Sequence, residues 1–306
     1  MKSIINKITA ALLPLILVFG LAACSDVKTA DKAVLTSFYP VYLIAERLVE
    51  GTDISLMNMA RPQTGCLHDY QLTSLDMRLL SKSKAVIING AGMEHSFIER
   101  AVENTGIKVI DSSDGLFGTE GEAVGHEEAF HSHDGHDHEL NSHIWMSLKM
   151  AKAQAENICA GLIGLYPQYK KELESNKELF LADIASLEKL EDSENEGGEF
   201  NVISFNEAFH YLLEENGAFI TAEIEIDENV TPTARELAEM TDSAGSLNVK
   251  AVFCADDNGR VFAETVGREL DIPVYILDPL TYTVSSDDYI KAMERNILTV
   301  SEAKNR

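Results

Sequence analysis

Short apolar segments alternate with helix-like segments along most of this chain, and that alternation restricts the fold more than any other feature. Residues 85–89 (AVIIN) and 249–254 (VKAVFC) are apolar runs of strand length, and the patterns that follow them at 94–103 and 260–270 are helical. Short buried strands that alternate with helices are typical of βαβ units and a parallel sheet. Further strands are expected at 33–37, 53–59, 107–110, 200–205, 218–224 and 274–277. Further helices are expected at 41–49, 75–80, 145–165, 208–215, 233–245 and 288–300.

One long segment without glycine or proline separates two such series. Residues 169–191 are expected to form a single helix of about six turns, because apolar residues recur there at helical spacing. These apolar residues are Leu173, Phe180, Ile184, Leu187 and Leu190. We therefore expect an α/β protein of two lobes, each with a mostly parallel sheet flanked by helices, joined by a long rigid linker helix. The alternative is one continuous doubly wound sheet.

The N-terminus has the features of a bacterial lipoprotein signal. Lys2 and Lys7 precede the apolar residues 8–20, a run shorter than the ~20 residues that a membrane-spanning helix needs. The sequence LAAC at 21–24 then matches a lipobox, with Cys24 as the site of lipid attachment. A plain secretory signal that contains a cysteine is the alternative. We expect an extracytoplasmic, lipid-anchored protein, on the outer face of the plasma membrane or in a periplasm.

These features divide the chain into five expected parts. They are a signal peptide (1–23), a tether (24–32), an N-terminal α/β lobe (33–167), the linker helix (168–192) and a C-terminal α/β lobe (198–306). Without the signal about 283 residues remain, which is enough for two domains with a sizeable core.

The chain is strongly acidic, with 50 Asp and Glu residues against 25 Lys and Arg residues. The signal contains two lysines and no acidic residue, so the mature chain has a net charge of −27. Such a surface repels nucleic acid and attracts cations, although it also serves simple solubility. We expect no nucleic-acid partner, and we expect a monomer.

The most unusual composition lies at residues 126–143, which hold six of the nine histidines and five carboxylates. Imidazole suits Zn²⁺, Cu²⁺ and Ni²⁺, and a histidine-dense tract has few other chemical uses. Residues 126–142 are polar and lack periodicity, so we expect a surface loop that interrupts the N-terminal lobe. Its auxiliary metal-binding residues are His126, His131, His133, His136 and His138.

Two histidines of the first half are candidate ligands of a single buried site. Ligands in open α/β sheets lie beyond the carboxyl ends of the strands. His68 lies in a loop before a helix, and His143 lies where the His-rich loop re-enters a helix. The structural alternatives are a capping or turn role for His68 and a surface position for His143.

The second half offers candidates at two strand ends. Asn206 and Glu207 follow the first strand of that half directly, and Asp278 follows its last strand. Asn206 and Asp278 are also good capping or turn residues. His210 falls four positions after Asn206, so a helix that begins there places both on one face. An exposed position on that helix is the alternative for His210.

The same residues lie in segments that resemble a known family. The chain is similar to the metal-binding lipoproteins of bacterial zinc and manganese ABC importers, and to the zinc-uptake branch especially. The resemblance covers essentially the whole mature chain. It rests on the segments 36–48, 65–97, 141–151, 203–217, 231–240 and 274–280.

The resemblance implies two α/β lobes joined by a rigid helix, with a metal ion bound in the cleft between them. It implies that His68 and His143 are ligands and that Asp278 supplies a fourth. The third ligand is the His or Glu that opens the motif after the first C-terminal strand. A His- and Asp-rich loop before the second ligand is also a feature of the zinc-uptake members, and it matches 126–142.

One departure from the family affects the third ligand, because position 206 is Asn. An amide oxygen is a weaker ligand for Zn²⁺ than imidazole or carboxylate. Three explanations remain. Asn206 coordinates weakly, or Glu207 or His210 replaces it, or the site is degraded and the loop does most of the binding.

We therefore expect a binding protein, not an enzyme, that captures Zn²⁺ as cargo and passes it to an ABC permease. Mn²⁺ is the less favoured ion, because imidazole-rich ligation favours zinc. A His-rich metal buffer with a degraded cleft is one alternative. A zinc-dependent hydrolase is another, although the sequence has no HExxH motif.

Overall fold

The computed structural model describes most of the chain after residue 32. The described residues are 33–60, 67, 70–95, 97–117, 140–195, 198–224, 232–255, 259–281 and 288–306.

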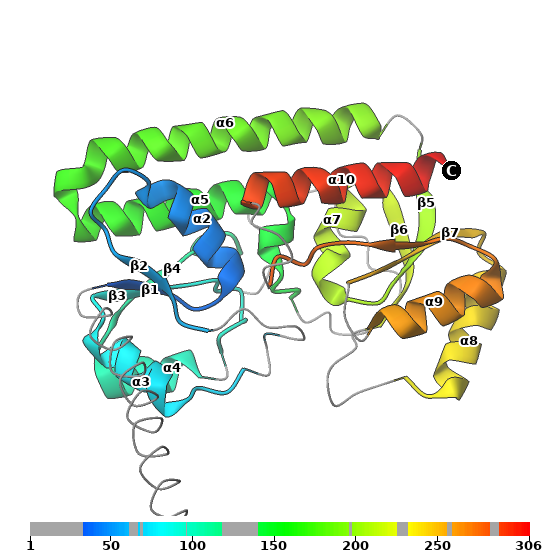
Figure 1. The fold of residues 1–306 in the computed structure, drawn as a ribbon, viewed down its shortest axis with the longest axis horizontal. Coiled ribbons are helices and arrows are strands. Elements are labelled where there is room, and N and C mark those ends of the chain that lie inside the picture. The colour runs from blue at the N-terminus through cyan, green and yellow to red at the C-terminus, as the bar shows by residue number, and fades with distance from the viewer. Residues whose placement is uncertain are drawn as a thin grey trace, which may run out of the picture.

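The N-terminal lobe is built on a parallel sheet. Its strands are β1 (Val34–Thr36), β2 (Leu56–Asn58), β3 (Ala85–Ile88) and β4 (Lys108–Asp111), in the order β2-β1-β3-β4. The central strands β1 and β3 are buried throughout, as their apolar sequences predict. The helices of this lobe are α2 (Tyr39–Val49), α3 (Ser74–Lys82), α4 (Ile98–Thr105) and α5 (Leu148–Leu165), with the 3₁₀ helix η2 (Ile144–Met146). In Figure 1, α3 and α4 cover one face of the sheet, and α2 and α5 cover the other.

The C-terminal lobe repeats this plan. Its strands are β5 (Phe200–Ser204), β6 (Ala218–Glu223), β7 (Val249–Cys254) and β8 (Val274–Ile276), in the order β6-β5-β7-β8, and all pairs are parallel. Its helices are η4 (Glu207–Phe209), α7 (His210–Glu215), α8 (Ala234–Gly245), α9 (Gly259–Leu270) and α10 (Tyr289–Asn305). The two lobes therefore have separate sheets, which confirms the predicted fold class and excludes the alternative of one continuous sheet.

The long helix α6 (Lys170–Glu194) runs along both lobes, preceded by the 3₁₀ helix η3 (Pro167–Tyr169), and α10 lies beside it (Figure 1). The inner face of α6 buries Leu173, Phe180, Ile184 and Leu187, the residues that recur at helical spacing in the sequence. One continuous buried cluster contains these residues and core residues of both lobes. The two lobes are consequently packed as one unit along this helix.

Two predicted helices begin three or four residues later than expected. The helix predicted at 145–165 is divided, because the Ser147 hydroxyl accepts the Met150 N–H and acts as the N-cap of α5. The helix predicted at 94–103 begins only at Ile98. The Glu94 carboxylate accepts backbone N–H groups of the preceding turn, which is a tertiary role that helical periodicity does not reveal.

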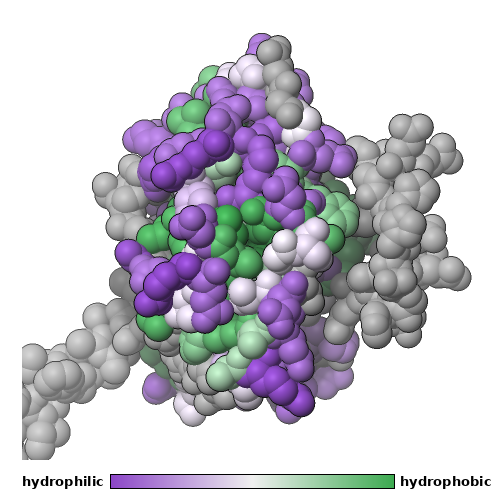
Figure 2. Space-filling model, turned by 90° about the vertical axis from the view of Figure 1, so that its right-hand side faces the viewer, coloured by the Kyte–Doolittle hydropathy of each residue, from purple (hydrophilic) through white to green (hydrophobic). Residues whose placement is uncertain are grey.

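Figure 2 shows the far end of the C-terminal lobe, opposite the junction with the N-terminal lobe. Hydrophobic surface gathers in the middle of this face, and hydrophilic side chains surround it. Exposed large apolar side chains of this lobe include Phe219, Leu247 and Val261.

Among the described residues, no helix combines the length and the apolar composition needed to cross a bilayer.

Candidate functional site

The junction between the lobes is organised around Trp145, which is fully buried in η2. Its indole Nε1–H donates to the Pro279 carbonyl (3.0 Å), and its own carbonyl accepts from the Tyr289 hydroxyl (2.6 Å). The Tyr289 ring packs at 5.6 Å from that of Phe180 on α6. The His143 ring lies edge-on to Trp145, with 5.0 Å between the ring centroids. The candidate ligand His143 is thus fixed against a rigid contact between the two lobes.

His143 is buried, and the side chain of Asn141 holds its ring. Asn141 Oδ1 accepts the backbone N–H of His143 (2.9 Å) and lies 2.9 Å from His143 Nδ1. The same side chain donates from Nδ2 to the Glu207 carbonyl of the C-terminal lobe (2.9 Å). The Tyr211 hydroxyl donates to the Asn141 carbonyl (2.8 Å). Asn141 therefore connects His143 to η4 and α7, a role that our sequence analysis did not assign to it.

The C-terminal carboxylate brought beside His143 is that of Glu207. Its Oε1 lies 3.9 Å from His143 Nδ1, and its side chain is about one-third exposed. The preceding residue, Asn206, is the N-cap of η4, since its Oδ1 accepts the Ala208 N–H (2.9 Å). The capping alternative considered for Asn206 is therefore the conformation that the structure contains.

His210 lies between carboxylates of its own lobe. Its Nδ1 is 3.3 Å from Glu223 Oε2, and its Nε2 is 3.5 Å from Glu214 Oε1. Burial lowers the pKa of His210, but Glu223, Glu214 and Glu207 together raise it more, so that the net shift is upward. Each ring nitrogen thus faces an acidic partner of its own lobe.

Asp278 lies where β8 ends, as predicted, and its backbone is firmly held. Its N–H donates to Asn296 Oδ1 (2.9 Å), and its carbonyl accepts from Asn296 Nδ2 (2.8 Å). Its carboxylate accepts the Leu280 N–H (2.9 Å) and lies 3.6 Å from Arg295. Burial raises the pKa of Tyr39 most, and the negative charges of Glu46 and then of Asp278 raise it further. The Asp278 charge therefore acts on α2 of the other lobe.

Glu94 is a buried carboxylate to which no motif in the sequence points. Glu94 accepts from the Ser37 hydroxyl (2.5 Å) and from the N–H groups of Asn89 (2.7 Å) and Gly90 (3.0 Å). Burial raises the pKa of Glu94 to about 7, although these hydrogen bonds oppose the shift. The Asn89 amide donates to the Ser142 carbonyl (2.9 Å), next to His143. Glu94 thus ties the ends of β1 and β3 together, and Asn89 links them to the segment that carries the candidate ligand.

Within the described part of the chain, no three or more His, Cys, Asp or Glu side chains gather as a metal-binding group. The following predicted residues lie outside the described residues: Cys24, His68, His126, His131, His133, His136 and His138.

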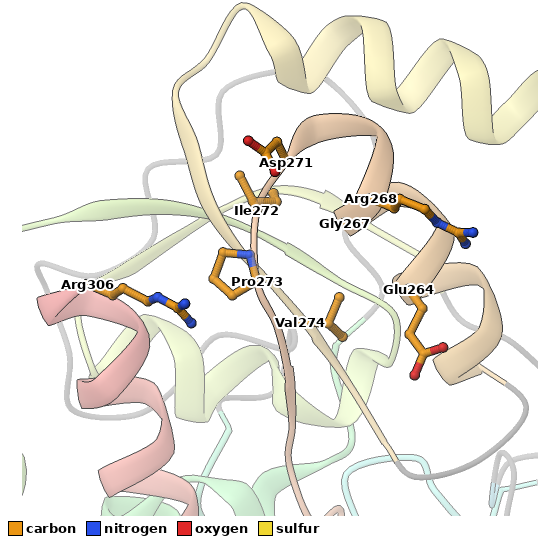
Figure 3. Close-up of a pocket in the computed structure, with 8 residues that line it drawn as sticks. All are labelled: Glu264, Gly267, Arg268, Asp271, Ile272, Pro273, Val274 and Arg306. Atoms are coloured by element: carbon orange, nitrogen blue, oxygen red, sulfur yellow. The ribbon is translucent and has the colours of Figure 1, made fainter.

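A separate hollow of about 670 Å³ lies on the C-terminal lobe, between α9, β8 and the end of α10 (Figure 3). It contains none of the candidate ligands. The side chains of two arginines and two acidic residues line it. Its lining residues are Glu264, Gly267, Arg268, Asp271, Ile272, Pro273, Val274 and Arg306.

Comparison with known proteins identifies the family. The model of the zinc-uptake complex component A family (ZnuA, periplasmic) matches residues 34–303. The chain belongs to this family. Its members are solute-binding proteins, not enzymes, which confirms that part of the sequence-based expectation.

Curated relatives and solved structures agree with this assignment. The zinc-binding lipoprotein AdcA of Streptococcus pneumoniae is 24% identical over 316 residues, which cover 98% of this chain and 62% of AdcA. The high-affinity zinc uptake system protein ZnuA of Bacillus subtilis is 24% identical over 293 residues, covering 90% of this chain and 91% of that protein. The chain thus spans less than two thirds of AdcA.

The fold itself matches solved structures closely. The binding protein FpvC of Pseudomonas aeruginosa, in complex with Mn²⁺, has a TM-score of 0.73 at 23% identity. The match covers 90% of this chain and 98% of FpvC. At that identity the likeness establishes the fold alone.

Proposed function

We propose that this protein captures Zn²⁺ between its lobes and delivers it to an ABC permease. The observation that carries the proposal is the burial of His143 at the lobe junction, with the carboxylate of Glu207 beside its ring. Imidazole and carboxylate ligands from two rigid bodies form a donor set that suits zinc. The names of AdcA and ZnuA, which refer to zinc, support the same ion.

The proposed ligands are His68 and His143 from the N-terminal lobe and carboxylates from the C-terminal lobe. Glu207 is the better third ligand, because the Asn206 amide oxygen already accepts a backbone N–H as a helix cap. The Glu207 carboxylate is nearest Nδ1 of His143 and is one-third exposed, so it has to turn toward Nε2 to share an ion bound there. His210 is not proposed as a ligand, since carboxylates face both of its ring nitrogens. Asp278 remains the fourth ligand, with the nearby Arg295 sharing its charge.

The N-terminal sequence and the family support a proposal for the location of the protein in the cell. We propose that Cys24 carries the lipid that holds the protein outside the cytoplasmic membrane, as a monomer beside its permease. Cys24→Ala then moves the protein from the membrane fraction to the soluble fraction of cells. If the variant stays with the membrane, Cys24 is not the anchor.

Calorimetry with Zn²⁺ at neutral pH tests the site. His143→Ala should weaken binding more than about 100-fold, beyond the roughly 10–100-fold losses typical of outer-shell partners. Glu207→Gln should weaken binding more than Asn206→Ala, which keeps the Glu207 carboxylate and removes a helix cap worth about 1 kcal/mol. Equal losses in these two variants would contradict the choice of Glu207. Below about pH 6, protonation of the imidazole ligands should weaken binding in the wild-type protein.

Deletion of the His-rich tract distinguishes a cleft site from a metal buffer that binds through the tract alone. Deletion of residues 126–139 should preserve one high-affinity Zn²⁺ site, because the proposed cleft ligands stay in place. If high-affinity binding disappears with the tract while His143→Ala has no effect, the protein is a metal buffer and the cleft is not its main site.

A further inference from the structure

We propose that Asn141 is a positioning residue that fixes the tautomer of His143, and that a backbone carbonyl of the opposite lobe fixes Asn141. This inference rests on the proposed function, because it concerns how the metal-binding nitrogen of His143 is prepared. Its structural part does not depend on a bound metal and can be tested without one.

The orientation of the Asn141 amide follows from its two backbone partners. The Glu207 carbonyl, 2.9 Å away, can only accept a hydrogen bond, so it requires the NH₂ end of the amide. The backbone N–H of His143, also at 2.9 Å, can only donate, so it requires the amide oxygen. The two requirements agree, and they exclude the flipped amide.

The tautomer of His143 follows from that orientation. The amide oxygen of Asn141 lies 2.9 Å from His143 Nδ1 and cannot donate a proton, so Nδ1 must carry the hydrogen. In a neutral imidazole the other nitrogen, Nε2, then has the lone pair. An outer partner that protonates one ring nitrogen and so prepares the other for the metal is a general feature of histidine sites.

The lobe contact and the ligand are thereby coupled. The Glu207 carbonyl belongs to η4 of the C-terminal lobe, and the Tyr211 hydroxyl of α7 also holds the Asn141 backbone. If the lobes separate here, the amide loses its hydrogen bond to the C-terminal lobe, and only the backbone N–H of His143 still holds the amide oxygen toward the ring. Zn²⁺ affinity is then expected to depend on the position of η4 against the N-terminal lobe as well as on the ligands themselves.

Nitrogen-15 NMR of the metal-free protein at about pH 8, where imidazoles are neutral, reads the tautomer directly. The His143 signals are identified by their loss in His143→Ala. We expect Nδ1–H in the wild-type protein and loss of that preference in Asn141→Ala, with Zn²⁺ affinity lowered about 10–100-fold. Asn157→Ala is the matched control, because the Asn157 amide also makes two hydrogen bonds, to Ser112 and Asp114, and none to His143. It should keep both the wild-type tautomer and the wild-type affinity.

Asn141→Asp keeps the test valid if the alanine variant folds poorly. Its carboxylate still accepts from Nδ1, so the Nδ1–H form should persist, and affinity should exceed that of Asn141→Ala. The inference is overturned if Asn141→Ala retains the Nδ1–H form, or if Asn141→Asp abolishes it. If instead the wild-type protein shows the expected tautomer but binds no Zn²⁺ that His143→Ala removes, the proposed function fails and the positioning role stands.

Discussion

Replacing Gly90 with alanine should destabilise this protein more than the same replacement at its near neighbour Gly92, and the comparison isolates one packing contact. Both glycines have positive φ, +76° for Gly90 and +86° for Gly92. A Cβ at Gly90 would overlap Asp111 Oδ1 and Ser113 Oγ and lie 2.8 Å from Ser113 Cβ, whereas a Cβ at Gly92 would meet nothing within 4 Å. Only the backbone conformation is therefore common to the two changes.

A methyl group at position 90 would displace two side-chain oxygens that hydrogen bonds hold in place. Asp111 Oδ1 accepts both the N–H and the hydroxyl of Ser113 (2.8 Å each), and Ser113 Oγ accepts the Ala91 N–H (2.9 Å). The left-handed conformation costs each substituted alanine about 1–2 kcal/mol. Overpacking adds about 1–3 kcal/mol at Gly90, and a broken hydrogen bond, partly buried here, adds about 1 kcal/mol more. We expect a loss of about 3–6 kcal/mol for Gly90→Ala and of about 1–2 kcal/mol for Gly92→Ala.

Urea unfolding, followed by the fluorescence of the single tryptophan and by circular dichroism, measures both free energies of unfolding. Equal losses in the two variants would refute the reasoning, because they would show that Asp111 and Ser113 move aside without cost. Gly90 also precedes the turn that holds Glu94, so Gly90→Ala should weaken Zn²⁺ binding as well, while Gly92→Ala should not.

Two further predictions concern carboxylates and their supports. Burial, followed by repulsion from Glu215, raises the pKa of Glu191 to about 7 from an unfolded value of 4.5. Between these pH values the native state holds a proton that the unfolded state has lost, so stability falls as the pH rises through them. The free energy of unfolding of Glu191→Gln should therefore match that of the wild type near pH 4 and exceed it at pH 8 by at most about 3 kcal/mol. Substitution of an exposed carboxylate, Glu178→Gln, is the control, and equal values for Glu191→Gln and the wild type at both pH values would contradict the prediction. Asn296→Ala removes both side-chain hydrogen bonds to the Asp278 backbone, so thermal unfolding should show a loss of about 2–3 kcal/mol, and an unchanged melting temperature would contradict this support.

The architecture was predictable because it depends on residue patterns longer than any single contact. The apolar run AVIIN and the spacing of Leu173, Phe180, Ile184 and Leu187 each specify one element, and the elements alternate as a parallel sheet requires. Element ends were less predictable, since they depend on individual side chains. Ser147 interrupts a pattern that is helical on both sides of it, because its hydroxyl caps α5.

At the candidate site, too, the sequence predicts the region but not the role of each side chain. The strand-end rule predicted the region of Asn206 and Glu207, but it does not decide which side chain points toward the other lobe. That choice follows from capping: Asn206 turns its oxygen onto the Ala208 N–H, and Glu207 then lies beside His143. The role of Asn141 depends on the distance between two lobes, which no local pattern contains.

The continuous core also limits how this protein can release an ion. Trp145, Tyr289 and Phe180 are fully buried at the lobe junction, and together with α6 they join the two halves. Side chains of these types bury about 150–250 Å² each, so exposing all three in a wide opening costs roughly 10–20 kcal/mol at about 25 cal/mol per Å². An open state at that cost is populated far too little to exchange metal. For the proposed zinc site, this cost favours exchange through a local rearrangement at the strand ends, such as a shift of η4 that breaks its hydrogen bond with Asn141, while the junction stays packed.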